Sequence, residues 1–387
     1  MAEFIGEKRR ARRCYGFDDV ALVPGRVTID PEDVDTSFYL GGRKFEVPIM
    51  ASAMDGVVSV KFAAAMSKLG GIATLNLDGV QTRYDNADEI LDEIAQADPQ
   101  KATELIQKLY TAPNKEELVA RRISEIKEQG GFASVSCIPA NAQRYAKIAE
   151  DAGADLFVVQ GTVINAKHVA SQYKPLDLYK FCSERKIPVI LGNCVTYDVT
   201  VDLMETGCAG LLVGVGPGAA CTTRGVLGIG VPQITATVDS AAARDYFYKK
   251  TGKYIPIITD GGMRIGGEIC KAIAAGADAV MIGSAFARAE EAPGRGYHWG
   301  MATFHSALPR GTRVRVETTG TLEQILMGPA KVDDGSQNLM GALKTSMGSL
   351  GAANLQEMQM VEIVIAPALQ TEGKVWQKAQ GIGMGAR

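Results

Sequence analysis

The chain has 387 residues, of which 46% are hydrophobic and 22% charged, and this length and composition support a large folded core. The formal net charge is −3, so we expect no general attraction to nucleic acid or to an anionic membrane surface. Seven scattered cysteines without a CxxC pair, no signal peptide and no long apolar run predict a reduced, cytoplasmic protein. The basic cluster at residues 8–13 is interpreted as a solvated N-terminal arm.

The first part of the chain predicts two strands and one helix. Residues 15–25 read as an entry segment that ends in a turn. Residues 47–51 form a short apolar run that predicts a strand. Apolar residues then recur at helical spacing over residues 60–69, until two glycines end the pattern. Residues 72–75 predict a second strand.

Residues 80–128 have a different composition. They are rich in Asp, Glu, Lys and Gln and follow a helical pattern throughout. The alternation of acidic and basic residues is typical of helices that face solvent. We therefore expect a helical excursion from the main fold in this segment.

A regular alternation of strands and helices begins after residue 131. Eight strands, each apolar on both faces and separated by helices, predict an α/β fold of the (β/α)8 TIM-barrel type, in one catalytic domain over residues 1–387. The alternative is a doubly wound sheet, which predicts a GxGxxG turn after the first strand, where this chain has residues 52–55, SAMD. Besides the two early strands, the predicted strands are residues 133–137, 156–160, 187–191, 211–214, 256–260 and 279–283.

The alternation ends near residue 295. Residues 302–321 predict a short flap, with a β-excursion over 308–321. Residues 321–350 follow a helical pattern, and residues 362–366 predict a strand. The glycine-rich residues 380–387 are expected to form a mobile tail.

The stretch 211–233, LLVGVGPGAACTTRGVLGIGVPQ, is the most informative for function. An apolar strand ends in Gly214, Gly216 and Gly218, which let a ligand approach the backbone closely. Cys221 follows in a loop, with hydroxyl groups beside it and Arg224 three residues further on. This setting favours a nucleophilic thiol. A cysteine in such a chain is more often a small buried apolar residue, and the glycines argue against that alternative for Cys221 alone.

Function in such a barrel is expected at the carboxyl ends of the strands. The last two strands end in the segments TDGGM and IGSAF, whose amide groups predict a phosphate cradle. A carboxylate would be repelled by a phosphate, so we expect Asp260 to face a different group, and a ribose diol is the natural partner.

The stretch around Cys221 resembles the active-site loop of the IMP dehydrogenase/GMP reductase family, GxGxGSxCTTR followed by GxGxPQ, with Ala219 in place of the usual serine. The resemblance covers nearly all of the chain. It implies that Cys221 attacks C2 of the purine of IMP, that hydride leaves to NAD, and that water hydrolyses the covalent thioimidate to XMP. By the same resemblance, Thr223 positions the attacking water.

The resemblance also implies the remaining site residues. IMP is expected to contact Ser52, Met54, Asp260, Gly261, Gly262, Gly283, Ser284, Gly300 and Met301. NAD is expected to contact Gln160, Thr162, Asn193, Gly214, Val215 and Gly216, where Gln160 replaces an aspartate of the family. A monovalent cation such as K+ would be held by the backbone carbonyls of Gly216, Gly218 and Cys221. A homotetramer is implied, and residues 80–128 are too short for the regulatory CBS modules that most IMP dehydrogenases insert there.

The chain also departs from the family pattern. In the YxGMG segment the tyrosine becomes His298 and the last glycine becomes Ala302, and no Arg-Tyr pair follows to activate water. Three interpretations stay open: an IMP dehydrogenase of guanine nucleotide biosynthesis, a GMP reductase that uses NADPH, and a catalytically silent nucleotide-binding protein. The loop after Arg224 lacks the basic residues typical of the reductases, and the intact CTTR segment argues against a silent protein.

Overall fold

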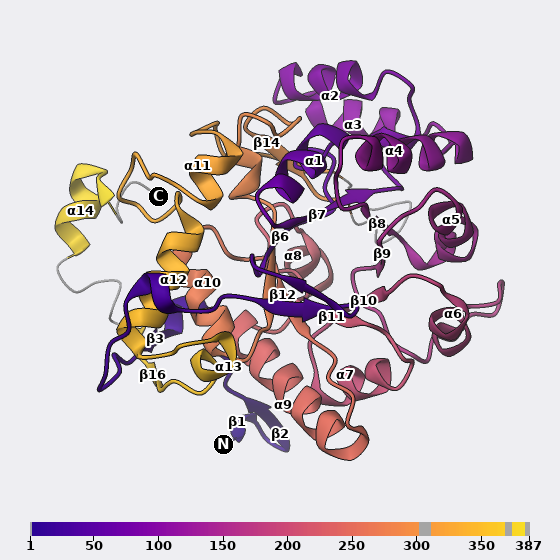
Figure 1. Cartoon of the computed structure of the whole chain (residues 1–387). Helices are drawn as coiled ribbons and strands as arrows, with labels where there is room; N and C mark the ends of the chain where they lie inside the picture. Colours follow the sequence, from indigo (N-terminus) through magenta and orange to yellow (C-terminus); the bar gives the residue numbers. More distant parts are fainter. Residues whose placement is uncertain (1, 302–310, 368–373, 384–387) are drawn as a thin grey trace.

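The computed structural model describes residues 2–301, 311–367 and 374–383 and contains a closed barrel of parallel strands (Figure 1). Each of the eight predicted strands overlaps one strand of this barrel, so the predicted (β/α)8 architecture is confirmed. The barrel consists of β6 (Ile49–Ala51), β7 (Ile72–Asn76), β8 (Ser134–Cys137), β9 (Leu156–Gln160), β10 (Val189–Cys194), β11 (Gly210–Val213), β12 (Ile257–Asp260) and β13 (Ala279–Ile282), and it closes by pairing β9 with β10 and β13 with β6.

Helices surround the barrel and cover the outer faces of its strands (Figure 1). Both faces of every strand are therefore buried, as in β7, where no residue is exposed. The helices up to the last strand are α1 (Val60–Lys68), α2 (Ala87–Gln96), α3 (Ala102–Leu109), α4 (Glu116–Glu128), α5 (Pro139–Asp151), α6 (Leu178–Glu184), α7 (Tyr197–Met204), α8 (Thr223–Leu227), α9 (Gln233–Thr251) and α10 (Gly266–Ala274). After the last strand follow α11 (Leu322–Leu326), α12 (Leu339–Leu350), α13 (Leu355–Met358) and α14 (Lys374–Gln380).

The segment expected as a helical excursion contains three helices. α4 packs between α1 and α5 in the ring around the barrel. α2 and α3 instead share a hydrophobic cluster of their own, in which Leu91 and Ile94 of α2 are buried with Ile106 and Leu109 of α3. Their apolar residues recur every three or four positions, which is why each helix buries only one face. The part that stands outside the ring is thus the stretch before α4.

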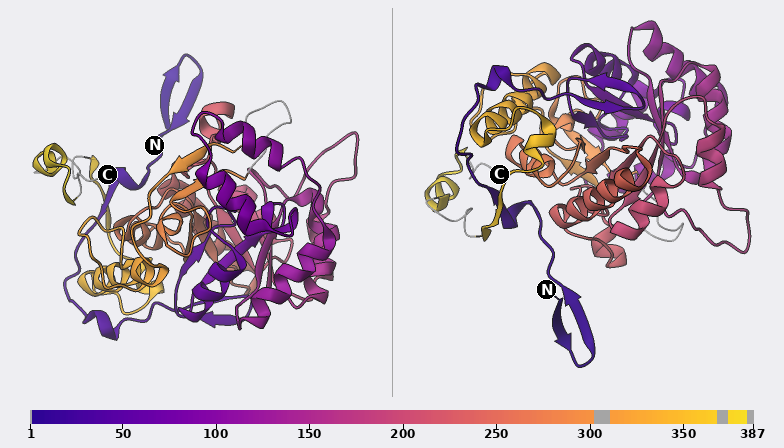
Figure 2. Two further views of the ribbon diagram at one scale, coloured as in Figure 1. Left: turned by 90° about the horizontal axis from the view of Figure 1, so that it is seen from above. Right: turned by 60° about the horizontal axis from the view of Figure 1, so that its bottom comes forward.

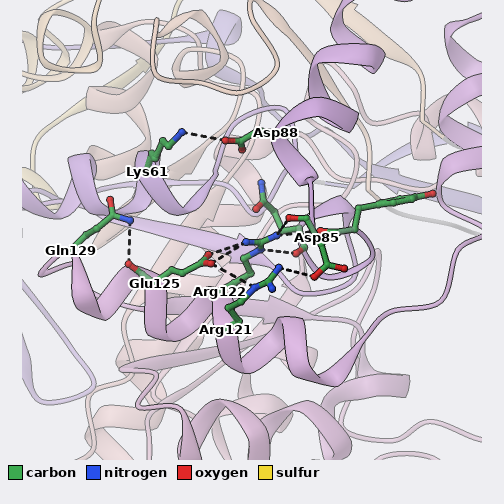
Figure 3. A network of polar contacts seen from close by, with 9 residues as sticks. Lys61, Asp85, Asp88, Arg121, Arg122, Glu125 and Gln129 are labelled. Carbon is green, nitrogen blue, oxygen red and sulfur yellow. Dashed lines mark hydrogen bonds and ion pairs between the residues drawn. The ribbon is translucent and has the colours of Figure 1, made fainter.

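Arg122 on α4 fastens this stretch to the ring (Figure 3). Its Nε donates to the carbonyl of Gln81 at 2.9 Å, and its Nη2 donates to the carbonyls of Tyr84 at 3.1 Å and Asp85 at 3.0 Å. Glu125 balances its charge at 2.9 Å. The neighbouring Arg121 has a side chain that is 44% exposed and makes only ion pairs at the surface, against 9% exposed for Arg122.

Short antiparallel pairs lie outside the barrel. β3 (Val20–Leu22) pairs with β16 (Ile363–Ile365), which confirms the strand predicted near residue 364. β4 (Phe38–Leu40) pairs with β5 (Arg43–Phe45), and β14 (Tyr297–Trp299) pairs with β15 (Arg313–Arg315). The basic N-terminal arm is a hairpin of β1 (Ala2–Gly6) and β2 (Arg9–Arg12), which projects away from the barrel (Figure 2).

Parts of two predicted segments lie outside the described residues. These are residues 302–310 of the predicted flap, and residues 384–387 of the predicted tail. The division of the chain into barrel, excursion, flap and tail stays a prediction. In the described ranges, no helix combines the length and the apolar character needed to cross a membrane.

Replacing Arg122 by Met is expected to lower the free energy of unfolding by about 3 kcal/mol, because it leaves buried carbonyls without donors. The matched change of Arg121 to Met removes an exposed ion pair and should cost less than about 1 kcal/mol. Urea denaturation of both variants measures the difference. Equal losses would show that Arg122 does not anchor the segment.

Candidate active site

Cys221 lies in the loop that follows strand β11. Its Sγ is 3.1 Å from Oγ1 of Thr223, the first residue of α8, whose side chain is buried. The Cys221 amide donates to the carbonyl of Gly218 at 3.0 Å, so the loop turns tightly just before the thiol. The geometry holds a partly exposed thiol beside a hydroxyl that can exchange a hydrogen bond with it.

Arg224 holds this loop in shape. Its Nε donates to the carbonyl of Val215 at 3.1 Å, and its Nη2 donates to the carbonyl of Val231 at 2.7 Å. The guanidinium therefore ties the two limbs of the loop together across the thiol. The Val215 side chain is itself buried, which leaves this residue little to offer a cofactor.

The buried cysteines are poorly suited to nucleophilic chemistry. Burial raises the pKa of the Cys194 and Cys270 thiols to about 11, and it raises the pKa of Cys137 and Cys208 as well. These residues serve as small apolar side chains of the core. Cys221 differs because it is partly exposed and lies at the carboxyl rim of the barrel.

Three strand ends meet at the carboxylate of Asp260, the last residue of β12. Its Oδ2 accepts hydrogen bonds from Nδ2 of Asn193 at 2.8 Å and from Nε2 of Gln160 at 3.1 Å. The same Gln160 nitrogen lies 3.2 Å from Oδ1 of Asn193. The structure thus brings two residues predicted for the cofactor together with the one predicted for the ribose.

Burial raises the pKa of Asp260 to about 6, although the hydrogen bond from Asn193 opposes the shift. The two amide donors both reach Oδ2, and the other carboxylate oxygen makes no hydrogen bond to any described residue. Oδ1 is therefore available to a hydroxyl donor of a ligand.

The predicted phosphate cradle is formed at the ends of β12 and β13. Within the described residues, the amide groups of Gly262, Gly283 and Ser284 have no hydrogen-bond acceptor, so they can donate to an anion. The Gly261 amide cannot, because it donates to the carbonyl of Met281 at 3.0 Å. Of the four glycine and serine amide groups in the segments TDGGM and IGSAF, the cradle therefore offers three to an anion.

His298 supports the cradle from behind. Its Nε2 lies 3.2 Å from Oγ of Ser284, and burial lowers the pKa of the imidazole to about 4. The ring is therefore neutral near pH 7. Its contact with Ser284 fixes the orientation of that hydroxyl at the edge of the cradle.

Ser52 and Met54 lie directly beside the cradle, after strand β6. A Cβ atom on Gly283 would lie 2.7 Å from Sδ of Met54 and 3.8 Å from Cβ of Ser52. A side chain at position 283 would therefore push the Met54 thioether away from the cradle. This contact groups the two residues predicted to hold the base with those predicted to hold the phosphate.

Gly300 and Met301 approach the site from strand β14. A Cβ atom on Gly300 would lie 2.8 Å from the carbonyl of Ala220, so this segment touches the loop just before the thiol. Sδ of Met301 lies 3.6 Å from the hydroxyl of Tyr110, and its side chain packs on the cluster of α2 and α3.

The remaining predicted cofactor and cation residues lie around Cys221. Thr162 follows β9 in a partly exposed loop, and its hydroxyl makes no hydrogen bond within the described chain. Gly214 follows β11 directly, and Gly216 lies two residues further on. The Gly218 carbonyl, predicted to bind a cation, accepts the amide of Cys221. No group of three metal-binding side chains occurs in the described ranges.

Several residues at the site received no role from the sequence. Nε2 of Gln233 donates to the carbonyl of Val213 at 2.6 Å and to that of Asp260 at 3.2 Å, which locks the ends of β11 and β12 together. Tyr110 and Trp299 approach the site from α3 and β14. An aromatic residue at the end of a polar helical segment predicts no more than packing against its neighbours, so no pattern in the sequence singles out Tyr110.

Comparisons with known proteins agree with one another. Residues 14–375 match the family model of the IMP dehydrogenase / GMP reductase domain. An uncharacterized oxidoreductase of Mycolicibacterium smegmatis is 39% identical and aligns with 93% of this chain and 99% of its own. The inosine-5'-monophosphate dehydrogenase of Cryptosporidium parvum is 30% identical, with 88% of this chain and 89% of that protein aligned. The crystal structure of an IMP dehydrogenase/GMP reductase-like protein from Corynebacterium glutamicum superposes with a TM-score of 0.89 at 37% identity, covering 94% of this chain and 97% of that one.

Replacing Asp260 by Asn is expected to stabilise the ligand-free protein at pH 8 by about 1–2 kcal/mol, because a partly buried charge is removed while an acceptor for Asn193 is kept. The pKa of Asp260 is raised by folding to about 6, so the stability linked to its protonation is complete below pH 4 and is lost as the pH rises through 6. The advantage of the variant should therefore vanish near pH 4.

Urea unfolding at pH 4.5, 6 and 8 measures this dependence. Asp151→Asn, a change at an exposed carboxylate of α5, is the control. A difference between wild type and Asp260→Asn that stays constant over this range would contradict the assignment.

Proposed function

The chain belongs to the IMP dehydrogenase/GMP reductase family, and from this premise we propose that it oxidises IMP to XMP with NAD+ as an IMP dehydrogenase. The proposal rests above all on one observation, the partly exposed Cys221 thiol held 3.1 Å from the Thr223 hydroxyl at the carboxyl rim of the barrel. The uncharacterized oxidoreductases among its relatives support redox chemistry in general, and the named dehydrogenases support this reaction in particular.

The proposed reaction proceeds through a covalent bond to Cys221. Its sulfur adds to C2 of the purine, and the hydrogen at C2 leaves as hydride, so that C2 is oxidised and a thioimidate remains. Water then adds to C2 and the thiol is expelled, which gives XMP with the oxygen of water. Thr223, whose Oγ1 lies 3.1 Å from the sulfur, would exchange a proton with it and orient the water.

Binding of IMP would use the residues around the cradle. The three free amides of Gly262, Gly283 and Ser284 suit the 5'-phosphate. The open oxygen of Asp260 suits the ribose diol, since Asn193 and Gln160 hold its other oxygen. Met54 and Ser52 then lie where the purine would pack.

NAD would supply the acceptor for the hydride. Two features fit a bound dinucleotide: the Thr162 hydroxyl is unpaired within the described chain, and Gly218 has open space where a side chain would be. Gly214 and Gly216 instead pack against the protein, since a Cβ atom on them would lie 2.3 Å from the Asp260 carbonyl oxygen and 2.6 Å from Cγ of Arg224. Gln160 and Asn193 would face the same space, although both are also engaged with Asp260. We further propose a monovalent cation such as K+ on the carbonyls of Gly216, Gly218 and Cys221, and a cytoplasmic homotetramer, as expected from the sequence.

The proposal is tested by mixing the purified protein with IMP and NAD+ and following NADH by absorbance at neutral pH with K+ present. Formation of NADH and XMP is the expected result. Oxidation of NADPH in the presence of GMP, without reduction of NAD+ in the presence of IMP, would make the protein a GMP reductase instead. Tight binding of IMP without turnover of either pair would make it a silent nucleotide-binding protein.

Replacing Cys221 by Ser should abolish turnover, by at least about a thousandfold in kcat, because the hydroxyl is a far weaker nucleophile than the thiol. Binding of IMP, measured by calorimetry, should change less than about threefold, since the phosphate and ribose contacts remain. Cys14→Ser, at another partly exposed cysteine, is the control and should retain full activity. Retained turnover in Cys221→Ser would refute the covalent mechanism.

A further inference from the structure

We propose that Tyr110 is a positioning residue that fixes the substrate loop after β6 and the Gly300–Met301 segment relative to each other, from a helix pair that itself has no contact with substrate. This inference rests on the proposed function of the site. Tyr110 lies just after α3, in the part of the chain predicted as a solvent-exposed excursion. Its phenol is nevertheless buried, with 6% of the residue exposed.

The hydroxyl of Tyr110 joins two segments that are far apart in sequence. It donates to Oδ2 of Asp55 at 2.5 Å and accepts a hydrogen bond from Nε1 of Trp299 at 2.8 Å. Asp55 and Trp299 are both fully buried. The three groups therefore form a continuous polar chain, Trp299 to Tyr110 to Asp55, in an otherwise apolar cluster.

Asp55 carries the constraint to the substrate loop. It directly follows Met54, the residue that packs against Gly283 of the phosphate cradle. Its Oδ2 also accepts the amide of Val80 at 2.6 Å. The loop after β6 is therefore tied at one carboxylate to both sides of the helix pair α2–α3, at Val80 before it and at Tyr110 after it.

Trp299 carries the constraint to the thiol loop. The next residue, Gly300, lies so close to Ala220 that a Cβ atom would be 2.8 Å from its carbonyl. Ala220 directly precedes Cys221. Met301 lies with its sulfur 3.6 Å from the Tyr110 oxygen, so this hydroxyl contacts the segment at two points.

The helix pair is a rigid support for Tyr110. Arg313 of β15 caps the end of α2, with Nη1 donating to the carbonyl of Ile94 at 2.6 Å and Nη2 donating to that of Ala97 at 2.8 Å. Gly311 lies against Ile106 of α3, where a Cβ atom would come within 2.5 Å of Cγ2. Arg122 holds the start of the segment from the ring. The segment that carries Tyr110 is thus held at three places, at the end of α2, at α3 and at its start.

Tyr84 offers a matched comparison in the same cluster. Its hydroxyl donates to the carbonyl of Leu109 at 2.8 Å, a bond that stays within the helix pair and reaches neither substrate segment. Replacing either tyrosine by Phe removes one hydroxyl from one hydrophobic cluster. Tyr110→Phe removes hydrogen bonds to two fully buried residues, so it should lose more stability than Tyr84→Phe, and it alone should weaken substrate binding.

The test compares Tyr110→Phe with Tyr84→Phe in the full chain. Tyr110→Phe is expected to raise KM and Kd for IMP about tenfold or more, since it leaves the Trp299 N–H without an acceptor and removes a donor from a buried carboxylate. kcat should change less than about threefold, because the thiol and Thr223 are not touched. Tyr84→Phe should leave both constants within about twofold. Thermal unfolding of both variants verifies that they fold.

Trp299→Phe provides the second leg of a double-mutant cycle. If Tyr110 acts through Trp299 as well as Asp55, the double variant should bind IMP no more than about twofold more weakly than Tyr110→Phe alone. Unchanged KM and Kd in Tyr110→Phe, or an equal shift in Tyr84→Phe, would overturn the proposal. Since Kd is measured without turnover, failure of the wild type to oxidise IMP would refute the proposed function without deciding the role of Tyr110.

Discussion

Parallel strands can be joined only by crossovers, and when eight of them close into a barrel their carboxyl ends must share one rim. All the chemistry considered above depends on this constraint. It places Gln160, Asn193 and Asp260 from three different strands within hydrogen-bond distance of one another. It also leaves the Asp260 carboxylate partly buried, with its pKa raised to about 6, in a position that a ribose diol could use. The site thus keeps a group that costs the ligand-free fold stability above that pH.

The barrel could be predicted because each of its strands has a local signal in the sequence. A strand buried on both faces must be a continuous apolar run, as at β7 and β11, and the helices between such runs end in glycine or polar turns. The thiol could be located for a similar reason, because the alternating glycines beside Cys221 mark an unusual loop. Their individual roles could not be predicted: Gly218 is open, whereas Gly214 and Gly216 make room for the Asp260 carbonyl and the Arg224 side chain.

Partners across the fold could not be predicted in the same way. The sequence predicted that the Gly261 amide binds phosphate, yet the register of β12 with β13 makes this amide donate to the carbonyl of Met281. The sequence predicted that Arg224 is a cation that favours the nearby thiolate. In the structure its guanidinium donates hydrogen bonds to the carbonyls of Val215 and Val231. Tyr110 lies in a polar helical stretch and gains its role only from Asp55 and Trp299, which are remote in sequence. Each of these outcomes depends on three-dimensional register, which local pattern does not encode.

The central claim is that oxidation passes through a covalent bond to Cys221. The most direct measurement is to mix the protein with IMP and NAD+, quench within the first turnover, digest, and identify modified peptides by mass spectrometry. The account predicts a purine nucleotide attached to the peptide that contains Cys221, in an amount equal to the NADH formed in that turnover. NADH formed without any adduct, or an adduct on a different cysteine, would contradict it.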